Sequence, residues 1–414
     1  MQKFMRIIEK ITYWMIILLP FSVAIAPGVS NTVIGVMIGA FFLEKIIKKE
    51  KLCTLSLQVI IFGVFIVIGA LSFINTVSVK ESINGMVKIF KFFFIFLVCS
   101  ESIKDREHFK KIAISVACAI SLIGIDALWQ LFSGKDFIRG NVIQEAIGLA
   151  RASASFPGSN AMGVYLTGLT PLIAGLALFS TRLKSRVFFT LAALMGSIGV
   201  YLSLSRGAGL GLFISVLFLT LLRKNKIIIW GLILLLVIFP FVMPKNIKVW
   251  AKSVNYNLVD LFICETRLSL YKNTVHMISQ HPFVGVGVNT FSKNYGKYKV
   301  AAVEAVTKTQ DTMYAHNSFL QMGGEMGLLG LGTFLIFLFF VLKSIWLAFK
   351  REKDHFLKAL SISVFAAIMA YLINGLTETS LYYARLVMIF YFLIGVGLAL
   401  DRRDKNVVDN HTGL

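Results

Sequence analysis

Long apolar runs, separated by short polar stretches, dominate the pattern of the chain. Each run holds about 17–22 mostly apolar residues, enough to cross a bilayer as a helix. Spanning segments must be helical because lipid cannot hydrogen-bond an open strand edge. The sequence therefore predicts an all-α, polytopic membrane bundle. Its roughly twelve transmembrane helices are expected near residues 11–26, 31–46, 55–75, 83–100, 112–132, 161–180, 187–203, 207–222, 227–243, 324–342, 357–374 and 384–400.

These runs divide the chain into four parts. Residues 1–243 hold the first nine helices with short connections, apart from an outer loop near 133–160. Residues 244–323 form a large outer loop, residues 324–400 hold the last three helices, and residues 401–414 form a tail. A connection as long as the large loop has its own structure or a function.

The large loop is expected to be partly helical. Apolar residues recur at spacings of three and four, at Leu268, Tyr271, Val275 and Ile278. This period predicts an amphipathic helix over residues 265–280 that lies on or near the membrane surface.

Composition agrees with a membrane protein. The 414 residues are 57% hydrophobic and include 36 phenylalanines, which is more apolar surface than one soluble core would bury. The net charge of +21 comes largely from basic clusters in every second connection. Because cytoplasmic connections carry such an excess, both termini are expected in the cytoplasm, with membrane lipids as partners. No soluble basic domain supports binding to nucleic acid.

Several cations lie on the predicted outer side, where this charge rule disfavours them: Lys88, Lys91, Arg151, Arg206, Arg267 and Arg385. Snorkelling at a helix end is the structural alternative for the lysines and Arg206, and a solvated helix face for Arg267. No carboxylate cluster suggests a metal site. The cations instead indicate a pocket for an anionic group, and a lipid diphosphate is the natural candidate because arginine donates two hydrogen bonds to phosphate at once.

One histidine, His316, lies at the expected membrane surface. A substrate embedded in the membrane and a second substrate exposed to water could meet there. His316 and Asn317 open the stretch HNSFLQMGGEMG, which leads into the tenth predicted helix. A neutral imidazole can take a proton from an attacking hydroxyl, and Asn317 could orient it or a sugar. The structural alternative for His316 is a hydrogen bond at the helix entry. Glu265, Glu325 and Glu378 are reserve candidates for the base.

Over most of its length the chain resembles the O-antigen ligase family of bacterial envelope glycosyltransferases. The resemblance rests on four stretches and on their order: Arg151 to Asn160, Ser205-Arg206-Gly207, Thr266 to Gly287, and His316 to Gly327. Lys88, within Met86-Val87-Lys88-Ile89-Phe90, looks like the family's lysine at the membrane edge.

The resemblance implies a GT-C-like, inverting glycosyltransferase of the bacterial inner membrane that uses no nucleotide sugar, cofactor or metal. Its donor would be a glycan on undecaprenyl diphosphate, and its acceptor a sugar hydroxyl of the lipid A–core on the periplasmic face. Arg206, Arg267 and Lys88 would hold the diphosphate and stabilise the leaving group, while His316 would act as general base. Substrate contacts are further expected from Lys91, Arg151, Asn160, Asn317 and Arg385.

Two alternatives remain open from the sequence. O-antigen polymerases and transferases that move glycans onto protein share a similar late outer loop and similar arginines, and no motif specifies the acceptor. A twelve-span transporter is the second alternative. It predicts related half-sequences and interrupted midplane helices, neither of which is found in the sequence, and it leaves the long outer loop unexplained.

Overall fold

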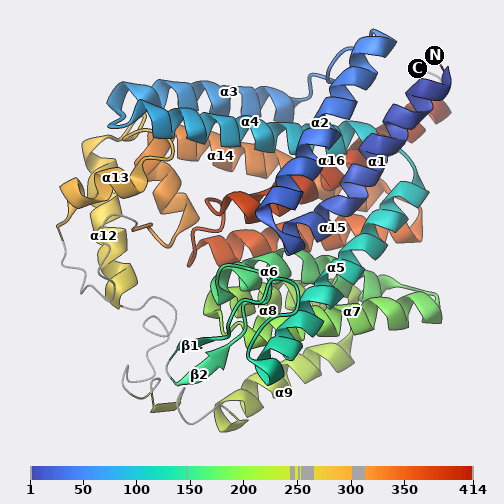
Figure 1. The fold of residues 1–414 in the computed structure, drawn as a ribbon. Coiled ribbons are helices and arrows are strands. Elements are labelled where there is room, and N and C mark those ends of the chain that lie inside the picture. The colour runs from blue at the N-terminus through green and yellow to red at the C-terminus, as the bar shows by residue number, and fades with distance from the viewer. Residues whose placement is uncertain are drawn as a thin grey trace.

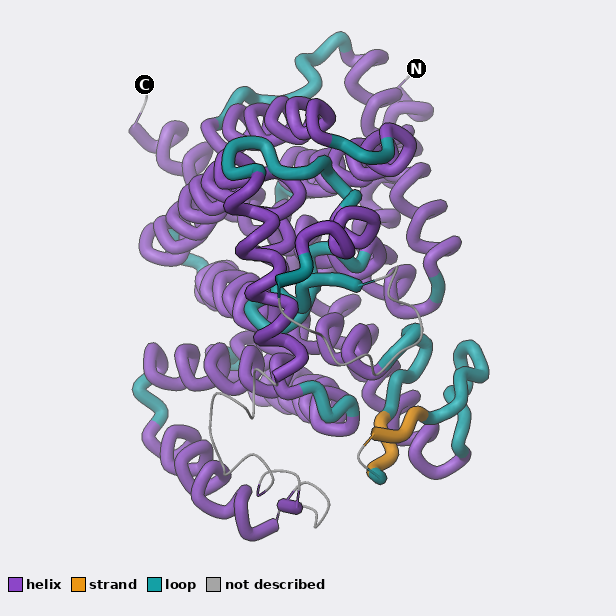
Figure 2. The backbone as a smooth tube through the Cα atoms, turned by 90° about the vertical axis from the view of Figure 1, so that its left-hand side faces the viewer, coloured by secondary structure: helices purple, strands orange, loops and turns teal. Residues whose placement is uncertain are grey.

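The described part of the chain is almost entirely helical (Figure 2). The computed structural model describes residues 2–146, 148–242, 248–249, 252, 265–300 and 313–412. The helices of the first half are α1 (Gln2–Ile25), α2 (Pro27–Lys48), α3 (Leu57–Leu71), α4 (Val79–Ser102), α5 (Arg106–Ser133), α6 (Ser159–Phe179), α7 (Leu183–Leu202), α8 (Arg206–Arg223) and α9 (Lys226–Val242). Those of the second half are α12 (Glu265–Gln280), α13 (Phe291–Tyr295), α14 (Ser318–Arg351), α15 (His355–Gly375) and α16 (Ala384–Thr412).

Short elements complete the described secondary structure. Two 3-10 turns, η1 (Ser72–Asn75) and η2 (Gly296–Tyr298), follow α3 and α13. Strands β1 (Gln144–Ala146) and β2 (Leu149–Arg151) form an antiparallel hairpin in which Gln144 pairs with Arg151. This hairpin lies in the predicted outer loop between the fifth and sixth spans.

The predicted membrane bundle is confirmed. Eleven helices of the described part are long and apolar enough to cross a membrane. The remaining predicted span, α9, has 17 residues, so at 1.5 Å per residue it is about 26 Å long, slightly short of a hydrocarbon core of about 30 Å. Among the candidate spans, α16 is the most enclosed, with 94% of its apolar window buried, whereas α2 has only 28%. The last helix is therefore at the centre of the bundle and the second is at its rim.

The helix connections fall at two ends of the bundle. In Figure 1 the two termini lie together at the upper right, whereas α12, α13 and the β1–β2 hairpin lie towards the left. Because successive spans run in opposite directions, the connections that carry Arg151, Arg206, His316 and Glu378 all lie at the end away from the termini. The residues that matter below are thus gathered at one face.

The predicted loop helix is present as α12, over the predicted residues. Its buried side, however, is not the apolar series read from the sequence: Leu268 and Val275 are exposed. The side that packs on the protein holds Leu270, Asn273, Thr274 and Met277 instead. The sequence pattern failed here because two polar side chains, rather than apolar ones, complete the buried stripe. The exposed apolar residues remain available to the membrane surface.

Helix α14 is broken near its start, at Gly327, where φ is 68°. Leu328 and Leu329 donate their backbone N–H groups to the neighbouring segment, to Pro282 O at 2.7 Å and to Phe283 O at 3.2 Å. In return, Val286 and Gly287 donate to the carbonyls of Gly324 and Glu325, each at 3.0 Å. Buried backbone groups require partners. The segment HPFVGVGVN, residues 281–289, therefore supplies hydrogen-bond partners to the backbone of α14 on both sides of the break.

This docked segment explains why a short glycine-rich stretch lies in the outer loop. A Cβ atom at Gly327 would lie 2.1 Å from Phe283 O, so no other residue fits at the break. The buried carboxylate of Glu325 then accepts backbone hydrogen bonds from Asn289 at 2.6 Å and from Phe291 at 3.2 Å. The first turns of α14, which follow His316, are thereby fixed to the outer loop.

Candidate active site

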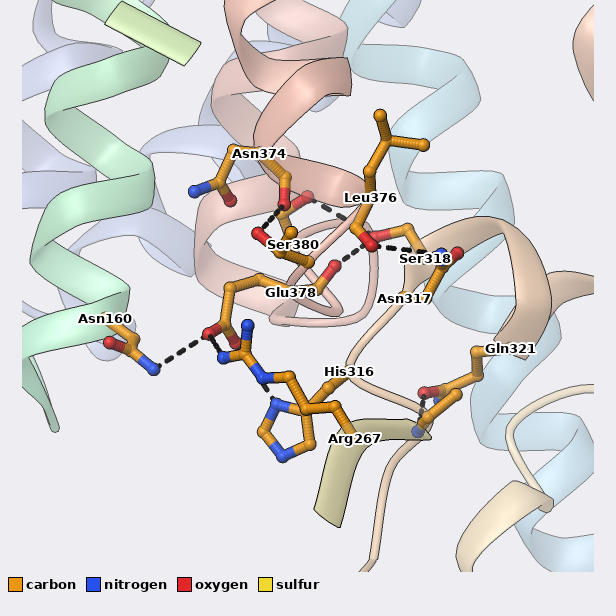
Figure 3. A network of polar contacts seen from close by, with 12 residues as sticks. Asn160, Arg267, His316, Asn317, Ser318, Gln321, Asn374, Leu376, Glu378 and Ser380 are labelled. Carbon is orange, nitrogen blue, oxygen red and sulfur yellow. Dashed lines mark hydrogen bonds and ion pairs between the residues drawn. The ribbon is translucent and has the colours of Figure 1, made fainter. Parts of the chain in front are cut away.

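Glu378, which lies in the short connection between α15 and α16, is at the centre of a polar cluster. Its side chain is only 2% exposed, and its Oε1 accepts a hydrogen bond from Arg267 Nη2 at 2.5 Å. The same oxygen accepts from Asn160 Nδ2 at 2.9 Å, and Oε2 lies 3.3 Å from His316 Nδ1. Figure 3 shows these three side chains converging on the carboxylate from three different segments.

The charge state of Glu378 follows from these contacts. Burial by itself would raise the pKa of its carboxyl group, but the hydrogen bond from His316 and the charge of Arg267 outweigh burial and hold the pKa below the ordinary value. Glu378 is therefore a carboxylate at neutral pH, and a carboxylate can only accept hydrogen bonds. In a neutral imidazole, the proton shared between His316 and this carboxylate lies on Nδ1, and Nε2 is then the acceptor.

The connection that carries Glu378 is fixed by buried contacts on both sides. Ser318, in the first turn of α14, donates from its hydroxyl to Glu378 O at 3.0 Å. Tyr371 of α15 donates from its hydroxyl to Ser380 O at 2.8 Å. Glu378 N also continues the helical pattern by donating to Asn374 O at 3.0 Å. A carboxylate held by its backbone in this way can orient a partner without moving itself.

His316 is held in an uncommon backbone conformation next to this carboxylate. Its φ is 48°, in the left-handed region that non-glycine residues rarely adopt. Asn317 begins α14 by accepting the backbone N–H groups of Phe319 at 2.9 Å and Leu320 at 3.0 Å. Tyr271 of α12 donates to His316 O at 3.2 Å. The His316 side chain is 37% exposed, in contrast to buried Glu378, so its ring can meet a substrate.

Asn317 therefore acts on its neighbour through the backbone. Its side-chain oxygen caps α14, and its Nδ2 donates to Leu376 O at 3.0 Å, in the connection that carries Glu378. This bond ties the start of α14 to the α15–α16 connection, so His316 and Glu378 are positioned by the same contact.

Besides Arg267, two further arginines, Arg151 and Arg206, lie next to this cluster. Arg151 donates to Asn160 Oδ1 at 2.7 Å and to Ser203 O at 2.9 Å. Burial lowers the pKa of Arg151, and the nearby charges of Arg206 and Arg267 lower it further, while Glu378 opposes them. Arg206 is the first residue of α8. A Cβ atom at Gly207 would lie 2.1 Å from Thr377 Oγ1, so this end of α8 packs directly on the connection that holds Glu378.

Among its described residues, the cluster has an excess of positive charge. Three guanidinium groups and one carboxylate belong to this described part, and His316 adds no negative charge. Such a site favours an anionic ligand, and arginine is the side chain best suited to phosphate oxygens. Within the described residues, no three His, Cys, Asp or Glu side chains come together as metal ligands would.

Three other residues from the sequence prediction lie apart from this cluster. Lys88 donates to Asn289 Oδ1 at 2.9 Å and lines a separate small cavity beside Glu325. Lys91 donates to Asn31 Oδ1 at 3.3 Å. Arg385 is buried, contacts the carbonyls of Val23, Ala24 and Ser155, and lies 4.5 Å from the ring of Phe156. Substrate binding by these three residues stays a prediction, and the contacts of Arg385 tie α16 to α1.

The sequence did not indicate how central Glu378 is. From the sequence, Glu378 is one of three reserve candidates for the general base, together with Glu265 and Glu325. The side chain of Glu265 lies outside the described residues. Glu325 is 1% exposed, and its carboxylate accepts hydrogen bonds from backbone N–H groups. A usable signal was the polar run Asn374-Gly375-Leu376-Thr377-Glu378-Thr379-Ser380 between two apolar spans. Such a run is longer than a simple turn requires.

Comparison with known proteins adds one family match and one structural likeness. A search of curated proteins finds no match. A chain in the structure "Structural coordination of polymerization and crosslinking by a peptidoglycan synthase complex" is 13% identical, with a TM-score of 0.48 over 84% of this chain and 97% of that chain. Residues 189–335 match the family model described as O-Antigen ligase. This match includes Arg206, Arg267 and His316, and it confirms the resemblance of this multi-pass membrane protein to the O-antigen ligase family.

Proposed function

We propose that this protein is an O-antigen ligase-type glycosyltransferase. It moves a glycan from undecaprenyl diphosphate to a sugar hydroxyl of the lipid A–core, on the periplasmic face of the inner membrane. The family match supports a lipid-linked glycan transferase of the ligase or polymerase type. The observation that carries the proposal further is the carboxylate of Glu378 between Arg267 and His316, with Arg151 and Arg206 beside it.

In this proposal His316 is the general base. Glu378 keeps the proton of the imidazole on Nδ1 and orients the ring, as a buried carboxylate does for histidine in other hydrolytic and transfer sites. The acceptor hydroxyl gives its proton to Nε2 as its oxygen attacks the anomeric carbon of the donor sugar. The role of the carboxylate is to hold the ring and to stabilise the imidazolium that forms.

The arginines bind the leaving group. As the new glycosidic bond forms, the bond between the anomeric carbon and the diphosphate oxygen breaks, and its electron pair leaves with undecaprenyl diphosphate. Negative charge therefore grows on the diphosphate in the transition state. Guanidinium groups of Arg206 and Arg267 stabilise that charge, and attack opposite the leaving group inverts the anomeric carbon. The imidazolium then loses its proton to water, which restores the base.

Deletion of the gene, with complementation, tests the acceptor and the donor together. Loss of a ligase leaves long glycan on its lipid carrier, not attached to the lipid A–core. Loss of a polymerase instead leaves only single repeat units. The proposal requires the first result. The wild-type gene should restore attachment of the glycan, and His316→Ala or Arg267→Ala at equal membrane abundance should not. Accumulation of single units only would assign the chain to polymerisation.

A further inference from the structure

A cavity with basic and apolar lining residues, separate from the one beside Lys88, lies at the end of the bundle opposite Glu378. Its volume is about 430 Å³, and it is enclosed by the start of α5, the connection between α6 and α7, and the start of α15. These three segments are far apart in the sequence. All of them belong to the end that carries the chain termini and the basic connections, which is the end expected in the cytoplasm.

The lining combines cations with an apolar floor. Arg106, Lys110, Arg182 and Lys184 contribute positive charge, and side chains such as Phe179 line its apolar part. Arg106 Nε contacts Asp354 Oδ2 at 3.0 Å and Lys110 Nζ lies 3.6 Å from Glu107 Oε1, so two of the four cations have carboxylate neighbours.

The other two cations are not neutralised in this way. Neither Arg182 nor Lys184 has a carboxylate within 4.0 Å in the described part of the chain, and both are exposed. The hydroxyls of Thr181 and Ser185 line the same cavity and can donate hydrogen bonds. The cavity thus offers two uncompensated cations and two hydroxyl donors beside apolar side chains.

The general excess of basic residues on a cytoplasmic face does not account for this arrangement. That excess requires only that cations lie somewhere in the connections. It does not require cations from separate connections to meet around one cavity, nor that aromatic rings form its floor. The cations and the apolar side chains together match two parts of a phospholipid at the membrane surface. These are the phosphate group and the first methylene groups of the acyl chains.

We propose that this cavity binds the phosphate headgroup of an acidic membrane phospholipid, such as phosphatidylglycerol, from the inner leaflet. The phosphate lies among Arg182, Lys184 and the hydroxyls, and the acyl chains leave along the apolar floor. Such a lipid bridges the α6–α7 connection to the start of α15. It is separate from the glycan transfer site, and this inference does not depend on the proposed function.

Native mass spectrometry of the purified full-length protein tests the site. The probe is phosphatidylglycerol, titrated into protein stripped of lipid in detergent, with phosphatidylethanolamine as the neutral comparison. The double variant Arg182→Gln/Lys184→Gln removes the two uncompensated cations. Each basic residue near the surface contributes about a factor of five to binding an acidic lipid, so the variant should bind phosphatidylglycerol roughly 30-fold more weakly.

The matched control is Lys49→Gln/Lys51→Gln, which removes the same charge from exposed residues of another basic connection. It should bind phosphatidylglycerol as the wild type does. A second variant, Ser185→Asp, leaves every cation in place and puts a carboxylate into the cavity, and it should also weaken binding by about fivefold. All three test residues, Arg182, Lys184 and Ser185, are exposed or half-buried, so folding is expected to be retained.

Three outcomes would overturn the inference. The first is equal weakening by the test and control pairs, which would indicate general surface charge. The second is equal affinity of the wild type for phosphatidylethanolamine. The third is displacement of phosphatidylglycerol by millimolar inorganic phosphate, which would identify a site for a soluble phosphate. Selective loss in Arg182→Gln/Lys184→Gln and Ser185→Asp, without competition by phosphate, supports it.

Discussion

The substitution Glu378→Gln separates the charge of the central carboxylate from its shape. Glutamine keeps the length of the side chain and one oxygen that can accept from Asn160 or Arg267. Its amide group, however, presents N–H donors where Glu378 Oε2 faces His316 Nδ1 at 3.3 Å. To accept from that amide, His316 must carry its proton on Nε2, and the nitrogen that should act as base is then occupied.

The expected loss of activity follows from that wrong tautomer. An analogous carboxylate-to-amide change beside a catalytic histidine costs about 10⁴-fold in turnover, and a general base contributes roughly 10²–10⁴-fold. We therefore expect Glu378→Gln to lower the turnover of glycan transfer by about 10²–10⁴-fold. Stability should fall as well, because the ion pair between Glu378 and Arg267, whose side chain is only 14% exposed, is lost, and breaking a buried pair costs about 3–5 kcal/mol.

The assay measures transfer by purified protein in nanodiscs, from a lipid-linked glycan to lipid A–core, with melting temperature recorded for each variant. Glu352→Gln is the control, since Glu352 is also largely buried and bound to an arginine, Arg403, at 2.9 Å, but at the other end of the bundle. The control should transfer glycan normally. In a double-mutant cycle, Glu378→Gln should add little to the defect of His316→Ala. Additive defects, or a Glu378→Gln variant that keeps more than about a tenth of wild-type turnover, would refute the base–carboxylate pair.

Two further predictions concern stability. Gly327→Ala should destabilise the protein by roughly 2–5 kcal/mol, from the left-handed backbone and the contact with Phe283 O, whereas Gly332→Ala in the same helix has open space and should fold normally; comparable melting temperatures for both would contradict the docked break in α14. The pKa of folded Glu378 is below its ordinary value of 4.5, so its stabilisation is present above that pH and lost as pH falls through the folded pKa. Melting curves of wild type and Glu378→Gln should therefore converge in acid, and a constant difference would count against a carboxylate with a lowered pKa.

The helices could be predicted from the sequence because the membrane imposes their length and composition. All twelve predicted stretches are helical, and α12 begins and ends as predicted. The buried side of α12 could not be predicted, since Asn273 and Thr274 lie buried among the outer-loop residues. The periodicity of a sequence identifies apolar positions. It does not identify polar side chains that form hydrogen bonds inside the fold.

The site was only partly predictable, for a related reason. His316, Arg206 and Arg267 were recognisable as unusual residue types on one side of the membrane and by a family resemblance. The common partner of His316 and Arg267, Glu378, lies 62 residues after His316, and that pairing is set by tertiary contacts. Lys88 shows the reverse case: it is also on the outer side, yet its amine binds Asn289 of the docked segment. The side of the membrane on which a residue lies restricts it to one face of the protein. It does not determine which cavity the residue lines.

The most direct measurement compares donor binding with turnover in His316→Ala. If the imidazole only takes the acceptor proton while the arginines hold the diphosphate, the variant should bind the lipid-linked donor within about twofold of wild type and transfer it at least about 10²-fold more slowly. Turnover close to that of the wild type, or a loss of donor affinity as large as the loss of rate, would contradict His316 as the base.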